Sequence, residues 1–138
     1  MTIERSILQA LQQKVIAAVA TSTMPTLPIK FVDVSFTIPN NQKWLEVIFI
    51  PNNAADITWG DEELNRGIMR LILHWPNNGA GAYAPLNLMA SIAATFTKSE
   101  RIAGLLQILN KPKTMTTVQQ GSENWYPVSV EYSVFSLA

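Results

Sequence analysis

The sequence predicts an α+β fold, in which a largely antiparallel or mixed sheet of about five strands carries two helices on one face. Three observations lead to this expectation. Segments with alternating apolar residues cluster along the chain instead of alternating regularly with helices. Two segments have the apolar spacing of amphipathic helices. The length of 138 residues suits one domain and hardly two, so we expect a single domain over residues 1–138.

The first helix is expected over residues 2–20. Apolar residues recur there at helical spacing: Ile3, Ile7, Leu11, Val15 and Ala18. Pro25 follows soon after, and proline disfavours helical geometry in the residue before it. The helix should therefore end near residue 21.

Two strands are expected next, over residues 29–38 and 44–50, with a turn at residues 39–42. In the first strand the residues expected to face the core are Val32, Val34, Phe36 and Ile38. In the second, one face carries Leu45, Val47 and Phe49, and the other carries Trp44, Glu46, Ile48 and Ile50.

The second half of the chain predicts three more strands and one more helix. A strand over 66–75 has an apolar face of Met69, Leu71, Leu73 and Trp75, with Arg66, Arg70 and His74 opposite. A helix over 82–96 allows Pro85 in its first turn and should bury Met89, Ile92, Ala93 and Phe96. A short strand over 105–110 and a long, clearly alternating strand over 126–135 complete the fold.

Charge and composition exclude several classes of function. Ten basic residues balance ten acidic ones, so the chain is not built to bind nucleic acid or an anionic membrane through its charge. No apolar run approaches the roughly 20 residues that span a bilayer. Without cysteine and with His74 as the single histidine, we expect no metal, no cofactor and a non-secreted protein of a reducing compartment.

The neutral total hides an uneven distribution of charge. Residues 1–63 hold four basic and seven acidic residues, and residues 64–138 hold six basic and three acidic ones. Such complementary halves suit head-to-tail contacts between copies, and equally suit salt bridges within one chain. We predict a subunit interface formed by Asp56, Trp59, Asp61, Glu62, Glu63, Arg66, Arg70, Lys111 and Lys113.

Each candidate residue also has a simpler interpretation. The 15 residues from 51 to 65 form a long connection, where Trp59 is either an interface anchor or folded back on its own domain. The acidic cluster 56–63 lacks the ligand spacing of a calcium loop and reads best as a solvated or partner-contacting loop. His74 has no nucleophile motif around it and is expected to be a hydrogen-bonded strand histidine.

The strand face that carries Arg66, Arg70 and His74 is neither cleanly polar nor cleanly apolar, because isoleucines and Trp44 share it. A mixed face of this kind either meets a partner subunit or is an ordinary solvated sheet face. The residues alone leave both interpretations open.

The order of segments resembles the small tail-terminator-like (tail completion) proteins of long-tailed bacteriophages. The resemblance runs along almost the whole chain, from the IERSILQAL helix and the strand ending WLEVIFIPN to the last strand, ENWYPVSVEYSVF. Its most specific part is NRGIMRLILHWPNNGAGAYAPLNLMASIAATF, a strand, a glycine turn and a helix. None of these segments is a catalytic motif.

The resemblance implies a structural virion protein and no enzyme. It implies a homo-oligomeric, six-fold ring at the head-proximal end of the tail, which contacts the tail tube protein and a head-completion protein after assembly in the host cytoplasm. The segments 51–65 and 111–123 would meet neighbouring subunits or the tube. Two alternatives stay open: a small ligand- or peptide-binding module, and a hydrolase that uses the carboxylates of residues 56–63.

Overall fold

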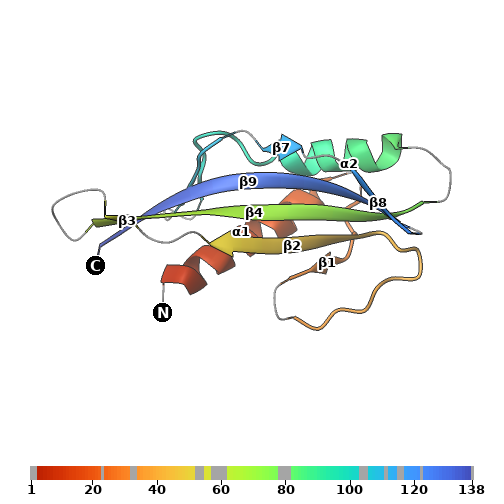
Figure 1. Cartoon of the computed structure of the whole chain (residues 1–138), viewed down its shortest axis with the longest axis horizontal. Helices are drawn as coiled ribbons and strands as arrows, with labels where there is room; N and C mark the ends of the chain where they lie inside the picture. The colour runs from red at the N-terminus through yellow and green to blue at the C-terminus, as the bar shows by residue number, and fades with distance from the viewer. Residues whose placement is uncertain are drawn as a thin grey trace.

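The computed structural model describes residues 3–22, 24–31, 34–51, 55–56, 62–77, 82–102, 106–110, 112–114, 117–121 and 123–137. Two helices and nine strands follow one another in this part of the chain (Figure 1). Their order is α1 (Ile3–Ala20), β1 (Ile29–Lys30), β2 (Trp44–Pro51), β3 (Ala55–Asp56), β4 (Glu62–Pro76), α2 (Tyr83–Ala93), β5 (Arg101–Ile102), β6 (Leu106–Ile108), β7 (Lys113–Thr114), β8 (Val118–Gln120) and β9 (Glu123–Leu137).

All nine strands belong to one mixed sheet. Six of them lie side by side in the order β1-β2-β4-β9-β6-β5, and the other three pair with β4 or β9. Its centre is an antiparallel pair of 15-residue strands, β4 and β9, in continuous register from Glu62 opposite Leu137 to Pro76 opposite Glu123. The short strands β6, β7 and β8 share the other edge of β9 in succession, and β3 pairs with the beginning of β4. The predicted α+β class is confirmed, with more strands than the five expected.

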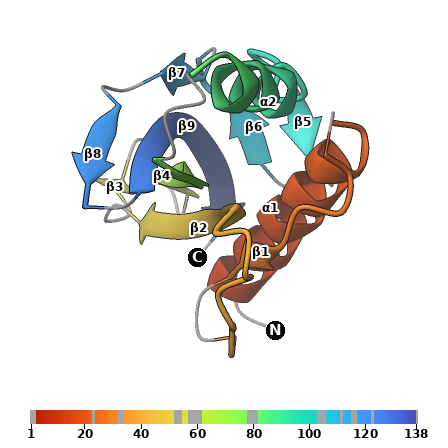
Figure 2. The same cartoon turned by 90° about the vertical axis from the view of Figure 1, so that its right-hand side faces the viewer.

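The core lies between one face of the sheet and the two helices. Figure 2 looks along the long strands and shows the sheet curled, with α1 and α2 lying against each other on one side of it. The helices contribute Leu11, Val15, Leu88, Met89 and Ile92, and the sheet contributes Leu45, Val47, Met69, Leu71, Leu73, Val128 and Val130, all of them buried. The apolar face predicted for the strand over 66–75 is therefore buried, and in the strand over 44–50 the core-facing side is the one that carries Leu45 and Val47.

The strand expected over residues 29–38 is wrong beyond Lys30. A turn in which the Val34 N–H donates to the Phe31 carbonyl (3.4 Å) leads the chain away from β2. Residues 34–38 belong to no strand, and Val34 and Ile38 are 57% and 59% exposed instead of facing the core. Val32 lies outside the described residues.

The other expected helices and strands are present with shifted ends. The connection expected over residues 51–65 is wrong in part, because Ala55 and Asp56 form β3 and β4 already begins at Glu62. The first helix is confirmed, the helix expected over 82–96 ends at Ala93, and β4 and β9 extend several residues beyond the strands expected over 66–75 and 126–135. Phe96 is buried as expected, although it lies after the helix. The short strand within 105–110 is present as β6.

Gly67 allows one close approach in the central pair of strands. It lies opposite Tyr132, and a Cβ at this position would clash with the Tyr132 ring. The tyrosine side chain is thus able to lie across β4 and is buried, which raises the pKa of its hydroxyl.

Candidate functional site

The residues predicted to form an interface fall into two groups along the long central strands. Asp56, Glu62 and Glu63 belong to the β3–β4 pair at one end of the sheet, and Figure 1 shows this end beside the C-terminal end of β9. Arg66 and Arg70 follow along β4, and Lys113 lies in β7. The predicted interface residues Trp59, Asp61 and Lys111 lie outside the described residues.

Three of the acidic candidates lie together along the backbone at one end of the sheet, which we call the acidic end. The antiparallel register places Asp56 directly opposite Glu63, and Glu62 is adjacent to Glu63 on β4.

The basic residues are brought together in one row across the sheet. Ser129 of β9 pairs with Arg70 of β4 on one side and with Lys113 of β7 on the other. The Nε atom of Arg70 is buried without a hydrogen-bond partner. Lys113 lies 3.8 Å from the Glu131 carboxylate, but its side chain is 67% exposed, so this ion pair contributes little to stability.

The acidic end and the basic row lie at different positions along β4. Glu63 and Arg70 are seven residues apart on this strand, which corresponds to about 23 Å of backbone. Arg66 lies between them, three residues from Glu63.

His74 is the centre of a buried cluster on the sheet face opposite the helices. Its ring stacks on Trp44 with a centroid separation of 3.7 Å and an interplanar angle of 4°. Its Nε2 lies 2.9 Å from Glu46 and its Nδ1 lies 3.2 Å from Glu123. Glu123 also accepts a hydrogen bond of 2.6 Å from the Trp125 indole. Strands β2, β4 and β9 are therefore joined at one point.

This cluster is suited to holding strands together, since its members come from β2, β4 and β9. A carboxylate accepts and does not donate, so both contacts are satisfied together when the His74 ring carries both protons. No serine or threonine hydroxyl is shown within hydrogen-bond distance of the ring among the contacts of the described residues. The expectation of a hydrogen-bonded strand histidine is confirmed.

The sequence reasoning missed both the burial of His74 and its second carboxylate partner. His74 is only 4% exposed, because Trp44 and Trp125 flank it on the neighbouring strands. Glu123 was missed because the last strand was expected to begin at residue 126. The alternation of that strand continues backwards through Trp125 to Glu123, which is the signal that could have placed both residues on the face of His74.

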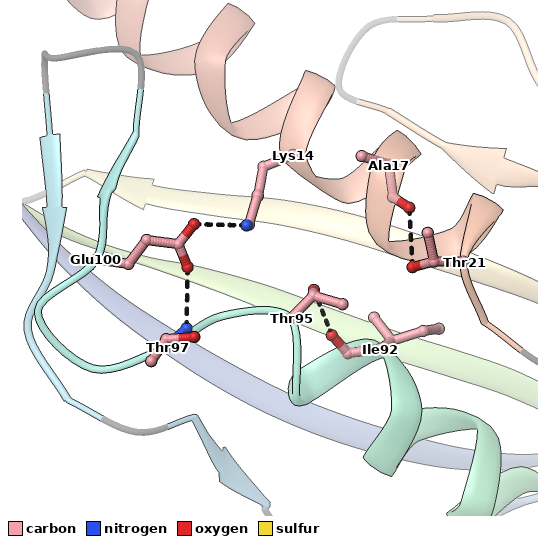
Figure 3. Close-up of polar contacts among 7 residues, drawn as sticks. All are labelled: Lys14, Ala17, Thr21, Ile92, Thr95, Thr97 and Glu100. Carbon is pink, nitrogen blue, oxygen red and sulfur yellow. Dashed lines mark hydrogen bonds and ion pairs between the residues drawn. The ribbon is translucent and has the colours of Figure 1, made fainter.

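A second polar contact holds the N-terminal helix to the rest of the fold (Figure 3). The Lys14 ammonium lies 2.6 Å from the Glu100 carboxylate, whose other oxygen accepts from the Thr97 N–H at 3.1 Å. Burial opposes ionisation, but the Lys14 hydrogen bond and charge and the Thr97 N–H together hold the pKa of Glu100 below its usual value. This contact lies away from the charged surfaces of the sheet and serves the fold.

The described residues give little support to a small-molecule site. A hollow between α2 and β9, lined by Met89, Ala93, Thr114, Tyr126 and Val128 among others, has a volume of about 70 Å³. Ligand pockets are typically about 300–1,000 Å³. In the described part of the chain, no three acidic or histidine side chains are arranged to hold a metal ion, and no helix is long and apolar enough to cross a membrane.

Comparisons with known proteins match most of the chain. A family model described as "Phage tail terminator protein" matches residues 6–132. A solved structure has the same fold, with a TM-score of 0.79 and 20% sequence identity over 95% of this chain and 94% of its own. At that identity the likeness supports the fold alone. No curated protein matches the sequence.

Proposed function

Because the chain belongs to the phage tail terminator protein family, it is a structural protein of a phage tail, and we propose that it acts there as a single domain that assembles into a ring. In this proposal the ring is six-fold, caps the head-proximal end of the tail tube and offers its other surface to a head-completion protein. Assembly takes place in the host cytoplasm, and the finished ring is part of the virion. The protein carries out no catalysis.

The observation that carries the ring proposal is the separation of opposite charges along β4. A head-to-tail contact requires two different, complementary surfaces on each copy. The acidic end around Asp56 and Glu63 lies at one end of β4, and Arg70 and Lys113 lie in one row farther along the sheet, so the two groups would supply two different surfaces. Zero net charge removes the long-range repulsion that would keep copies apart.

The tail tube protein and a head-completion protein are the proposed partners on the two faces of the ring. A terminator must offer different surfaces to them, and a head-to-tail ring has two different faces by symmetry. We expect neither nucleic-acid binding nor membrane binding, because the exposed charge is sparse and mixed in sign.

The experiment that tests the proposal measures assembly directly. Light scattering and electron micrographs of the purified chain should show a closed ring, and adding the ring to polymerising tail tube protein should stop growth at one end. A chain that stays monomeric at high concentration, alone and with tube protein, would contradict the proposal. A ring that leaves tube growth unchanged would contradict the capping role.

A further inference from the structure

The buried cluster around His74 places a hydrogen-bond acceptor at each nitrogen of the imidazole. Nε2 lies 2.9 Å from an oxygen of Glu46, and Nδ1 lies 3.2 Å from an oxygen of Glu123. An ionised carboxylate accepts hydrogen bonds and cannot donate them. A neutral imidazole has one N–H, so its other nitrogen would face a carboxylate oxygen with no proton between the two atoms. An imidazole that carries both protons donates to both carboxylates.

The two carboxylates are held in their ionised, accepting form. Oε1 of Glu123, the oxygen that contacts His74, also accepts from the Trp125 indole N–H at 2.6 Å. The side chains of Glu46 and Glu123 are 24% and 26% exposed, so water reaches both and supports their charge. The proton that satisfies both contacts therefore belongs on the imidazole.

Glu46 has a second positive charge nearby. Lys30 of β1 lies opposite Glu46 in the parallel β1–β2 pair, and its Nζ lies 5.9 Å from the centre of the Trp44 ring that stacks on His74. Glu46 is thus able to turn from the imidazole toward Lys30 or water, whereas the indole N–H holds Glu123 in place. The contact with Glu46 is the one that a neutral imidazole would lose.

The other charged groups of the described residues lie farther from the imidazole. Arg70, on the same face of β4, is four residues away, about 13 Å along the strand. Lys43 lies over the Trp75 ring, 4.5 Å from its centre, on the core side of β4. In β8 the residue opposite Glu123 is an uncharged glutamine. The two carboxylates and Lys30 therefore determine the charge around the imidazole.

We propose that His74 is a positively charged link between β2 and β9, and that loss of one proton releases Glu46 and loosens the beginning of β2 from β4. The link is complete in mild acid, below the ordinary histidine value of about 6.5, and is lost as the pH rises and the folded imidazole gives up its proton. Segment 34–38 should loosen with β2, because Phe36 packs against Trp44 with a centroid separation of 5.1 Å. This inference does not depend on the assembly proposed above.

The single histidine of the chain allows the protonation state to be measured directly. Nitrogen NMR shifts of the imidazole distinguish the doubly protonated form from each neutral tautomer. At about pH 5.5, where glutamates are ordinarily ionised, we expect both nitrogens of His74 to carry protons, and Nε2 to lose its proton as the pH rises. A neutral imidazole at about pH 5.5 would overturn the proposal.

Hydrogen exchange of the wild-type chain tests the structural consequence. Raising the pH from about 5.5 to about 8.5 should lower the protection of amides 45–48 in β2 by about tenfold relative to the amides of α1, after correction for the intrinsic pH dependence of exchange. If β2 and α1 keep the same relative protection while His74 loses its proton, the proposed loosening is wrong.

Glu46→Gln separates the charge of the link from its packing. The new amide is able to donate to Nε2 of a neutral imidazole while Nδ1 still donates to Glu123, so the imidazole should lose its proton at lower pH than in the wild type. Amides 45–48 should then stay protected up to about pH 8.5. The matched control is Glu131→Gln, which removes the same charge from the same face of β9, eight residues from Glu123, and should keep the wild-type profile.

The outcomes decide between a charged link and a merely structural histidine. If Glu46→Gln and Glu131→Gln both keep the wild-type pH profile, the charge of Glu46 is not linked to the proton of His74 and the proposal is overturned. If Glu46→Gln does not fold, the NMR and exchange measurements on the wild-type chain still decide, because they require no substitution.

Discussion

At the scale of single residues, the cluster around His74 joins polar and aromatic side chains from three strands. His74 is buried between two aromatic rings and contacts a carboxylate on each of two neighbouring strands. The alternation of the strand placed His74 correctly on the face opposite the helices. It could not identify the partners, because Glu46 and Glu123 come from strands whose register is set by tertiary pairing.

Replacing His74 should destabilise the protein strongly. In His74→Ala, Glu46 and Glu123 lose their shared partner and the Trp44 ring loses its stacked neighbour, so we expect the free energy of unfolding to fall by about 2–4 kcal/mol. Urea denaturation measures this value. The control is Lys113→Ala, an exposed position where a change within about 0.5 kcal/mol is expected. Equal effects of the two variants would contradict the assigned role of the cluster.

The contact between Lys14 and Glu100 should give stability that depends on pH. Because the pKa of Glu100 is lowered in the folded state, its contribution is complete above the usual value of 4.5 and is lost as the pH falls through the lowered pKa. Glu100→Gln should therefore lower the free energy of unfolding by about 0.5–1 kcal/mol at neutral pH, and the difference from wild type should shrink in acid. Urea denaturation at several pH values measures this difference.

Lys14→Gln serves as the partner control for this experiment, since it removes the same ion pair from the other side. The two changes combined should cost less than the sum of their separate effects at neutral pH. A Glu100→Gln deficit that stays constant down to strongly acidic pH would show that the carboxylate charge is not the stabilising feature.

At the scale of elements, the segments whose periodic pattern matches their structure were predictable. The structure of segment 34–38, which depends on its surroundings, was not. The apolar alternation around Met69 and Leu71 identified β4, and the helical spacing through Leu11 and Val15 identified α1. The segment 34–38 has an equally good strand pattern, yet it pairs with no strand among the described residues. Apolar alternation in a sequence indicates which face of a strand would be buried. It does not indicate whether the edge of another strand is available for pairing.

The spatial grouping of the candidate interface residues was not predictable from the sequence, for the same reason. The charge asymmetry along the chain identified the acidic and basic residues, but their spatial grouping depends on strand register. Arg70 and Lys113 are 43 positions apart in sequence and lie in one row only because both strands pair with Ser129. The short strand β7, which brings Lys113 there, has no periodic signal of its own at two residues.

Reversing one exposed charge of the basic row should weaken assembly. Lys113→Glu introduces repulsion toward the acidic end of a neighbouring copy, and we expect association to weaken by about tenfold, with the effect smaller at high salt. Sedimentation at two salt concentrations measures this. Adding Glu63→Lys should restore part of the affinity, and Lys98→Glu, at an exposed residue after α2, should change little. Equal effects of Lys98→Glu and Lys113→Glu would contradict a specific charge contact.

At the scale of the whole molecule, the fold is a curled sheet that uses one face for its core and leaves the rest of its surface for contacts. Both helices cover the same face (Figure 2), and among the described residues no helix covers the opposite face. On that opposite face, the end near Trp44 is closed by the aromatic cluster, whereas Ile50 at the other end is 40% exposed. The mixed composition of this face therefore reflects two regions, one buried and one exposed.

The central pair of strands also has a consequence for how the chain reaches its native state. Every pairing between β4 and β9 joins residues that are between 47 and 75 positions apart in sequence, from Pro76 with Glu123 to Glu62 with Leu137. Closing such long loops lowers the entropy of the chain before stabilising contacts between the two strands can form. Long-range pairing of this kind makes folding slow. During synthesis, β4 cannot form its pairing with β9 until the C-terminal residues of the chain have been made. Folding of the sheet can thus be completed only after β9 has been made.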